Sequence, residues 1–188
     1  MTEVIGRRER KKAQTRQALA DAALALFLER GFDEVGVKEV ADAADVSVTT
    51  LFKYFPSKEA LLFDQEADIE AALVNAVRGR PPGRSIVDAL REHILRDVSD
   101  GGPDDEFLAL IESTPGLRDY ARRMWMRHET ALARAIAEES GAPEDDVSCA
   151  ALARFALASR ELITGHENPR AAAEEIFGRL ARGWRPAS

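Results

Sequence analysis

The sequence predicts an all-α protein of about nine helices, arranged as a small N-terminal helical domain and a larger C-terminal one. Two observations lead to this prediction. Ala, Leu, Glu and Arg recur at helical spacing along the 188 residues, and alternating runs of β-branched and aromatic residues are missing. Glycine, proline and serine clusters separate the apolar stripes, so each stripe is expected to form one helix.

The ends of the predicted helices follow from single residues. In chain order the helices are expected to cover residues 12–30, 37–44, 48–55, 58–77, 85–98, 104–112, 117–139, 143–163 and 169–182. Gly31 supplies the left-handed residue that commonly follows a helix, and Pro56 disfavours the α conformation at the residue before it. Ser47, Ser57 and Asn168 are suitable N-caps for the third, fourth and last helices.

The later helices are separated by clear breaks. The segment GRPPGR, residues 79–84, ends the fourth helix, and SDGGP, residues 99–103, ends the fifth. Ser140 and Gly141 close the long seventh helix, and Pro143 with three acidic residues opens the eighth. Pro169 stands at the first position of the last helix, where its missing N–H costs nothing.

Charge is distributed unevenly along the chain. The net charge is −7, yet residues 1–58 hold ten Lys and Arg against nine Asp and Glu, and the remainder holds 16 against 24. The N-terminal excess lies in a basic arm that consists of Arg7, Arg8, Arg10, Lys11, Lys12 and Arg16. Such a segment is either a solvated tail or a set of contacts to phosphate.

Several classes of protein are not expected. Cys149 is the single cysteine, and there is no CxxC pair or Cys/His cluster, so we expect no disulfide, metal or cofactor. Without an apolar run of roughly 18 residues or a signal peptide, we expect a cytoplasmic protein that spans no membrane. Common catalytic motifs are absent, and His128 and His166 lack a second ligand at helical spacing, so we do not expect an enzyme.

Residues 37–55 have the proportions of a helix-turn-helix, with two short helices joined by a tight turn. The expected inward positions are apolar, and they are Val40, Ala41, Ala44, Val46, Leu51 and Phe55. Phe52 is expected in the core as well. In this motif the start of the second helix meets base edges in the major groove. Short helix pairs also occur in many other helical domains, so the proportions alone do not decide the function.

The N-terminal third resembles the tetracycline-repressor (TetR) family of bacterial regulators. The motifs that carry the resemblance are Thr15-Arg16, Leu19, Ala22-Ala23, Leu26-Phe27, Gly31-Phe32, Val40-Ala41, Val46-Ser47, Thr50-Leu51-Phe52, Tyr54-Phe55 and Lys58-Glu59-Ala60-Leu61. They cover residues 12–62 in the family's order and spacing. The resemblance implies a helix-turn-helix DNA-binding domain over residues 1–57 and a helical domain for ligand binding and dimerisation over residues 58–188.

The resemblance also implies the DNA contacts. Val48, Thr49 and Lys53 correspond to base contacts, Thr50, Tyr54 and Lys58 to phosphate contacts, and Lys38 to either. Thr50 alternatively bonds within its own helix. Three positions depart from the family pattern. Phe52 replaces a tyrosine whose hydroxyl reaches phosphate, Val37 replaces a capping threonine, and Asp45 replaces the glycine of the turn, where aspartate tolerates a left-handed backbone.

For the C-terminal domain the resemblance is architectural. Residues too polar or too bulky for an Ala/Leu bundle are candidates for a ligand pocket, and they are His93, Phe107, Met124, Trp125, His128 and Phe155. Each of them is alternatively a plain core or surface residue. Small side chains and apolar stripes within residues 144–183 favour a homodimer through the last two helices, although these helices alternatively close the core of the monomer.

The function implied by the resemblance is a repressor that binds palindromic operator DNA as a homodimer and is released by a small molecule. The alternative is a DNA-binding regulator that a protein partner controls, or one without a small-molecule ligand.

Overall fold

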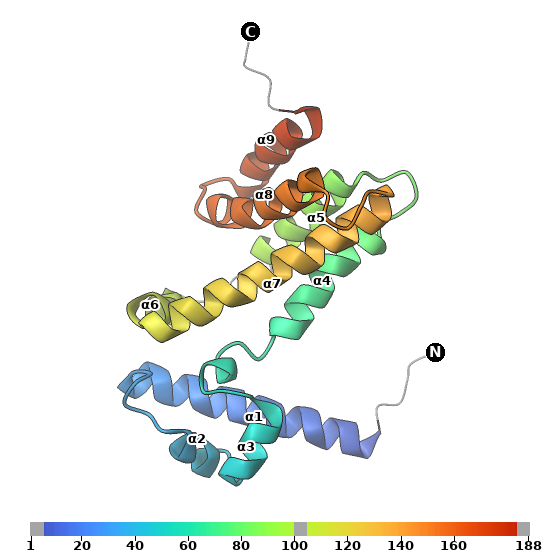
Figure 1. Cartoon of the computed structure of the whole chain (residues 1–188). Coiled ribbons are helices and arrows are strands. Elements are labelled where there is room, and N and C mark those ends of the chain that lie inside the picture. The colour runs from blue at the N-terminus through green and yellow to red at the C-terminus, as the bar shows by residue number, and fades with distance from the viewer. Residues whose placement is uncertain (1–5, 100–104, 184–188) are drawn as a thin grey trace. The chain divides into compact units, whose positions relative to one another are not determined.

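The computed structural model of the protein describes residues 6–99 and 105–183 (Figure 1). These residues form nine α-helices and one 3-10 helix, η1, and contain no strand, so the all-α prediction is confirmed. The elements are α1 (Arg7–Arg30), α2 (Val37–Ala43), α3 (Val48–Tyr54), η1 (Glu59–Leu61), α4 (Glu66–Arg78), α5 (Ile86–Ser99), α6 (Asp105–Ser113), α7 (Pro115–Ser140), α8 (Val147–Thr164) and α9 (Pro169–Arg182). Within this part of the chain, no helix combines the length and the apolar character that a membrane span needs.

The chain folds into two compact units. Among the described residues, the first unit contains 6–66 and 105–122, and the second contains 67–99 and 123–183. The predicted domain boundary between residues 57 and 58 falls inside the first unit. That unit contains η1, α6 and the beginning of α7 in addition to the first three helices, and together they form one compact body.

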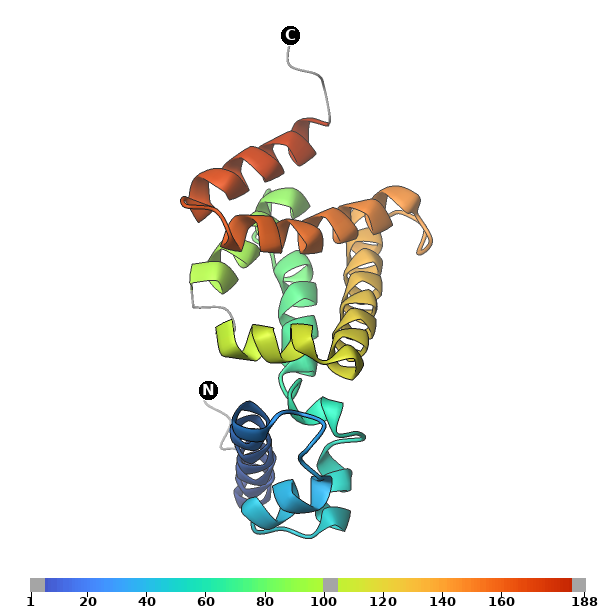
Figure 2. The ribbon, with the colours of Figure 1, turned by 90° about the vertical axis from the view of Figure 1, so that its left-hand side faces the viewer.

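The core of the first unit is built where α1, α2, α3 and η1 meet (Figure 2). Leu19 and Phe27 of α1 are fully buried, and so are Val40 of α2 and Leu51 of α3. Their spacing puts one apolar side of each amphipathic helix inward, and burying each such side chain stabilises the fold by about 1.5–3 kcal/mol. Both short helices therefore depend on packing against α1, since seven residues are too few for a helix that is stable alone.

The turn between α2 and α3 is a Schellman motif. The N–H of Val46 donates to the Ala41 carbonyl at 2.9 Å, and the N–H of Asp45 donates to the Asp42 carbonyl at 3.2 Å. Asp45 has a φ of 53°, in the left-handed region that usually favours glycine. The prediction that aspartate would take this conformation is confirmed.

The helix predicted over residues 58–77 is interrupted, so that prediction was wrong in part. The Oγ of Ser57 accepts from the N–H of Ala60 at 3.3 Å, but the helix that follows is only the short η1, whose N-cap position is Lys58. The N–H groups of Leu61, Leu62 and Phe63 donate to the carbonyls three residues earlier, at 3.3, 3.0 and 3.3 Å, which is the 3-10 pattern. The carbonyl of Asp64, between η1 and α4, accepts a hydrogen bond from Arg16 at 2.7 Å, and α4 begins at Glu66.

The second unit has its own core among α4, α5, α7, α8 and α9, and α9 lies on α5 and α8. Leu90, Leu132, Ile163 and Phe177 are fully buried there. Asn168 caps α9 as predicted, since its Oδ1 accepts from the N–H of Ala171 at 3.1 Å. The prediction that α8 opens at Pro143 was four residues early, because α8 begins at Val147, after its N-cap Asp146.

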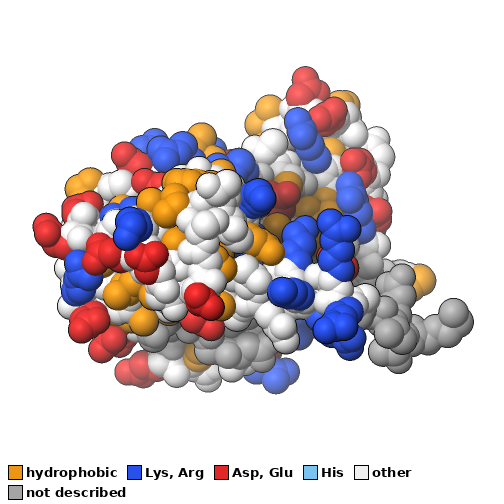
Figure 3. All heavy atoms as spheres, turned by 90° about the horizontal axis from the view of Figure 1, so that it is seen from below, with side chains coloured by type: hydrophobic (Ala, Val, Ile, Leu, Met, Phe, Trp, Pro, Cys, Tyr) orange, Lys and Arg blue, Asp and Glu red, His pale blue; other side chains and the backbone are white. Residues whose placement is uncertain are grey.

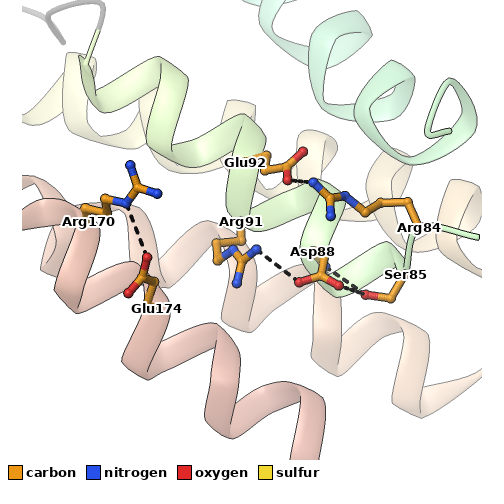
Figure 4. Close-up of polar contacts among 7 residues, drawn as sticks. All are labelled: Arg84, Ser85, Asp88, Arg91, Glu92, Arg170 and Glu174. Atoms are coloured by element: carbon orange, nitrogen blue, oxygen red, sulfur yellow. Dashed lines mark hydrogen bonds and ion pairs between the residues drawn. The ribbon is translucent and has the colours of Figure 1, made fainter.

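The outer surfaces of α5 and α9 carry polar contacts within each helix or at its start (Figure 4). The Oγ of Ser85 accepts from the N–H of Asp88 at 3.0 Å and caps α5, and Arg91 pairs with Asp88 at 3.2 Å. On α9, Arg170 pairs with Glu174 at 3.2 Å, one helical turn later. Such exposed pairs contribute about 0.3–0.5 kcal/mol each.

Candidate DNA-binding site

Two features hold α3 in place. The Oγ of Ser47 accepts from the N–H of Thr50 at 3.1 Å, which satisfies one of the free donors at the start of the helix. Leu51 and Phe55, one helical turn apart, are buried in the core of the first unit. Together they fix which side of α3 faces outward.

The outward side of α3 carries Thr49, Phe52 and Lys53, which are all exposed. Val48 is half-buried, because part of its side chain packs against the core of the first unit. The structure therefore brings together a hydroxyl, an ammonium, an aromatic ring and part of a branched aliphatic side chain within two turns of one helix. These groups match the major-groove edges of base pairs, which offer hydrogen-bond acceptors and the thymine methyl.

The prediction that Phe52 packs in the core was wrong, since 48% of the residue is exposed. Leu51 and Phe55 already occupy the inward positions one turn apart. Position 52 follows Leu51 by about a quarter of a turn and shares the side of Thr49 and Lys53. The aromatic side chain of Phe52 suggested that it is buried. Its position on the helix, next to the inward Leu51, instead places it on the exposed side.

Thr50 and Tyr54 are half-buried on the flank of α3. The Oγ1 of Thr50 lies 2.9 Å from the Oγ of Ser47, so this hydroxyl takes part in the cap of its own helix. Tyr54 packs partly against the core of the first unit. Its backbone carbonyl, at the last residue of α3, accepts from Arg16 at 3.2 Å.

At the start of α2, Lys38 is exposed and pairs with Asp42 one turn later at 3.1 Å. The missing threonine cap at Val37 is replaced by Glu39, whose carboxylate accepts from the N–H of Gly36 at 2.9 Å. Arg30 also donates to Glu39, at 2.6 Å. The hydrogen bond from Gly36 and that from Arg30 lower the pKa of Glu39 below its ordinary value.

Lys58 points inward. Its ammonium donates to the backbone carbonyl of Phe32 and lies 4.2 Å from the centre of the Phe32 ring and 5.5 Å from that of Phe27. Burial lowers the pKa of Lys58, and nearby carboxylates such as Asp33 only partly oppose this effect. The side chain thus binds the chain segment that follows α1.

The basic arm forms the first turns of α1, which begins at Arg7 and not near residue 12 as predicted. Arg7, Arg8, Arg10, Lys11 and Lys12 are all exposed there. Figure 3 shows a group of Lys and Arg side chains on one part of the surface. Arg16 differs from the rest of the arm, because its guanidinium turns inward to backbone carbonyls.

The structure brings together only part of the predicted ligand set. Met124 and His128 are buried in the second unit, and the rings of Trp125 and His128 meet edge-on with centroids 5.3 Å apart. His93 of α5 is half-buried, and burial lowers its pKa. Phe107 belongs to the first unit, where its ring lies 6.3 Å from that of Phe63, and 55% of Phe155 is exposed on α8.

His128 has a partner that the sequence did not indicate. Its Nδ1 lies 3.3 Å from Oε2 of Glu70 on α4, while its buried Nε2 has no hydrogen-bond partner among the described residues. Glu70 also lines a groove of about 540 Å³ in the second unit, and none of the predicted ligand residues is in that lining. The remaining lining residues are Arg123, Met126, Arg127, Thr130, Ala131 and Arg134.

Comparison with known proteins agrees with this geometry. The sequence model of the tetR family of bacterial regulatory proteins matches residues 19–64, which contain α2, α3 and η1. The HTH-type transcriptional regulator TcmR of Streptomyces glaucescens is 35% identical over 153 residues, a match that covers 75% of this chain and 67% of TcmR. The chain belongs to the TetR family. It is therefore a transcriptional regulator of the helix-turn-helix, DNA-binding class.

Other TetR-family proteins share the fold. RutR of Escherichia coli is 40% identical over 76 residues, which is 39% of this chain and 36% of RutR. A TetR-family regulator from Streptomyces coelicolor has a TM-score of 0.64 at 18% identity, covering 95% of this chain and 98% of its own. FadR of Thermus thermophilus, a TetR-family repressor in complex with lauroyl-CoA, has a TM-score of 0.55 at 25% identity, covering 92% and 96%.

The sequence did not indicate two contacts in this TetR-family protein, those of Arg16 in the first unit and that of Glu70 with His128 in the second. The inward turn of Arg16 had no signal, because its partners Tyr54 and Asp64 lie 38 and 48 residues away along the chain. Glu70 likewise lies 58 residues from His128. The exposure of Phe52, in contrast, was available from the helical spacing of Leu51 and Phe55.

Proposed function

We propose that this TetR-family regulator is a repressor that binds palindromic operator DNA as a homodimer and leaves the operator when a small molecule binds. One observation carries the DNA-binding part. The buried pair Leu51 and Phe55 leaves Thr49 and Lys53 exposed on the outward side of α3, next to the half-buried Val48. A helix whose inward side is packed in the core, and whose outward side carries both apolar and hydrogen-bonding groups, fits the major groove.

The proposed base contacts are Val48, Thr49 and Lys53. Lys53 donates to guanine acceptors, and the methyl groups of Val48 and Thr49 pack on thymine methyls. The exposed parts of these side chains support the assignment.

The proposed phosphate contacts are Thr50, Tyr54 and Lys38, together with the exposed cations at the start of α1. Lys38 is exposed near the start of α2, and its ammonium supplies a positive charge for a backbone phosphate. Lys58 is not among the proposed contacts, because its ammonium binds the Phe32 carbonyl.

We propose that α8 and α9 pair with a second copy of the chain. Val147, Phe155 and Leu162 of α8 are 80%, 55% and 67% exposed, and their spacing puts them on the same half of the helix. Leaving three large apolar side chains in water along one helix is unfavourable, and pairing with an identical surface removes them from water. A twofold dimer matches a palindromic operator.

The proposed effector site is the interior of the second unit around Met124, Trp125 and His128. Nδ1 of His128 lies beside the carboxylate of Glu70, and the buried Nε2 on the other side of the ring has no hydrogen-bond partner among the described residues. A buried polar atom without a partner costs about 1–3 kcal/mol, and a ligand group that hydrogen-bonds to this nitrogen removes that cost. This chemistry supports an apolar effector that carries one hydrogen-bonding group.

The test uses the duplex that the full-length protein enriches from a random-sequence DNA pool. A library of apolar alcohols, phenols and amides is screened for a rise in the unfolding temperature, and each hit is added to the protein bound to that duplex. We expect hits that release the duplex and that lose their effect in His128→Phe. Absence of any enriched duplex contradicts the DNA-binding proposal, and hits that leave the duplex bound favour control by a protein partner.

A further inference from the structure

Arg16 makes three contacts with one guanidinium. Nη1 donates to the carbonyl of Tyr54 at 3.2 Å, Nη2 donates to the carbonyl of Asp64 at 2.7 Å, and Cζ lies 4.5 Å from the centre of the Phe55 ring. The three partners belong to the last residue of α3, the residue after it, and the segment before α4. Arg16 itself lies on α1, so it joins three segments of the first unit.

The contacts use the particular chemistry of arginine. Tyr54 is the last residue of α3, and its carbonyl has no partner within that helix. A planar guanidinium offers five donors in a fixed fork and stacks on an aromatic ring, so one side chain reaches two carbonyls and the Phe55 ring together. A lysine ammonium carries the same charge without the fork or the flat face.

We propose that Arg16 is a positioning residue for sequence recognition, holding the C-terminal end of α3 against α1 without touching DNA. This inference rests on the proposed role of α3. Loss of the contacts leaves the end of α3 fixed by the apolar packing of Leu51, Tyr54 and Phe55, without a polar link to α1. Thr49 and Lys53 then sample several orientations, and the population able to read the correct bases falls. The exposed cations of the basic arm still attract phosphate.

The proposal gives Arg16 a different role from that of the cations beside it in the sequence. A phosphate contact contributes to affinity for all DNA and to its salt dependence, whereas a positioning residue contributes to the preference for one sequence. Arg10 is the matched control, because it lies on the same helix and is exposed.

The experiment compares full-length wild-type protein with Arg16→Lys, Arg16→Gln and Arg10→Gln. Binding is measured by fluorescence anisotropy at several salt concentrations, on the duplex that wild-type protein enriches and on a scrambled duplex of equal composition. Both Arg16 variants are expected to raise Kd for the enriched duplex at least about tenfold, the equivalent of one charge-assisted hydrogen bond. Their Kd for the scrambled duplex and their salt slope should match the wild type.

Arg10→Gln should weaken both duplexes and reduce the salt slope by about 0.9, the value for one lost phosphate contact. Wild-type behaviour of Arg16→Lys overturns the proposal, because a phosphate contact tolerates lysine. A reduced salt slope in Arg16→Gln overturns it as well.

Amide hydrogen exchange on the DNA-free proteins provides a readout that does not depend on an operator. In both Arg16 variants we expect faster exchange confined to residues 48–55 and 61–66. Unchanged exchange in these segments overturns the proposal. Equally faster exchange in α5 and α9 overturns it as well, because it indicates general unfolding of the variant. If wild-type protein enriches no duplex, the proposed function fails, and the exchange measurement still decides whether Arg16 holds α3.

Discussion

Phe52 lies about half-exposed on the side of α3 that carries Thr49 and Lys53, and its ring has no group that hydrogen-bonds a phosphate. At this position the TetR-family pattern has a tyrosine whose hydroxyl reaches phosphate. Phe52→Tyr is therefore expected to strengthen binding to all duplexes by about 1 kcal/mol, the net contribution of one hydrogen bond. The salt slope should stay constant, because no charge is added. Anisotropy titrations check this, and weaker or unchanged binding contradicts it.

Glu39 gives the first unit a defined response to acid. Its folded pKa lies below the ordinary value, because the Gly36 N–H and Arg30 bond to the ionised carboxylate. The folded state therefore binds a proton at Glu39 more weakly than the unfolded state does. The contribution of the Glu39 carboxylate to the stability of the folded state is complete above the unfolded pKa and is lost as the pH falls through the folded pKa. Wild-type protein should unfold at a higher temperature than Glu39→Gln at neutral pH, and the gap should close on acidification.

The control for this pH dependence is Glu161→Gln, at an exposed position of α8. Its unfolding temperature is expected to follow that of the wild type across the same range. Parallel curves for wild type and Glu39→Gln would show that the carboxylate of Glu39 does not support the start of α2.

At the scale of elements, the turn before α3 depends on the left-handed conformation of Asp45. A β-branched residue is disfavoured there, so Asp45→Val is expected to destabilise the protein by about 1–2 kcal/mol. Asp45→Gly is the matched variant, since glycine adopts this conformation freely. Denaturant unfolding followed by circular dichroism measures both changes. Equal stability of the two variants would contradict the account of the turn.

Local signals in the sequence were sufficient for most elements. Gly31, Ser47 and Asn168 act on backbone groups within a few residues, and each ends or caps a helix as predicted. The break between η1 and α4 was missed, and one contact at this break comes from a distant part of the chain, since the Asp64 carbonyl accepts from Arg16 of α1.

The inward positions of Arg16 and Lys58 have the same explanation. From the sequence alone, a Lys or Arg side chain is expected to be solvated or bound to phosphate. The backbone carbonyls that bind Arg16 and Lys58 lie at least 26 residues away along the chain. Charge alone therefore identified the exposed cations of α1 as candidates for phosphate contact but did not separate Arg16 from them. Tertiary geometry was needed for that distinction.

At the scale of the whole molecule, the proposed operator binding rests on the proposed pairing of two chains through α8 and α9. Phe155→Glu combined with Leu162→Glu places two charges on the exposed apolar face of α8 and is expected to abolish the dimer. Light scattering after size exclusion should give twice the mass of one chain for the wild type and a single mass for the variant. Leu108→Glu, at another exposed apolar position, is the control and should remain dimeric. A dimeric double variant rules out the α8 interface.

The outward side of α3 is the feature on which the whole account depends. The most direct measurement is selection from a random DNA pool by wild-type protein, Lys53→Ala and the control Arg96→Ala, which removes an exposed cation of α5. We predict a palindromic sequence for wild type and control, and a loss of preference in each half-site for Lys53→Ala of about 1–3 kcal/mol at the base pair that Lys53 contacts. Identical sequences from wild type and Lys53→Ala, or no enriched sequence from the wild type, would contradict the account.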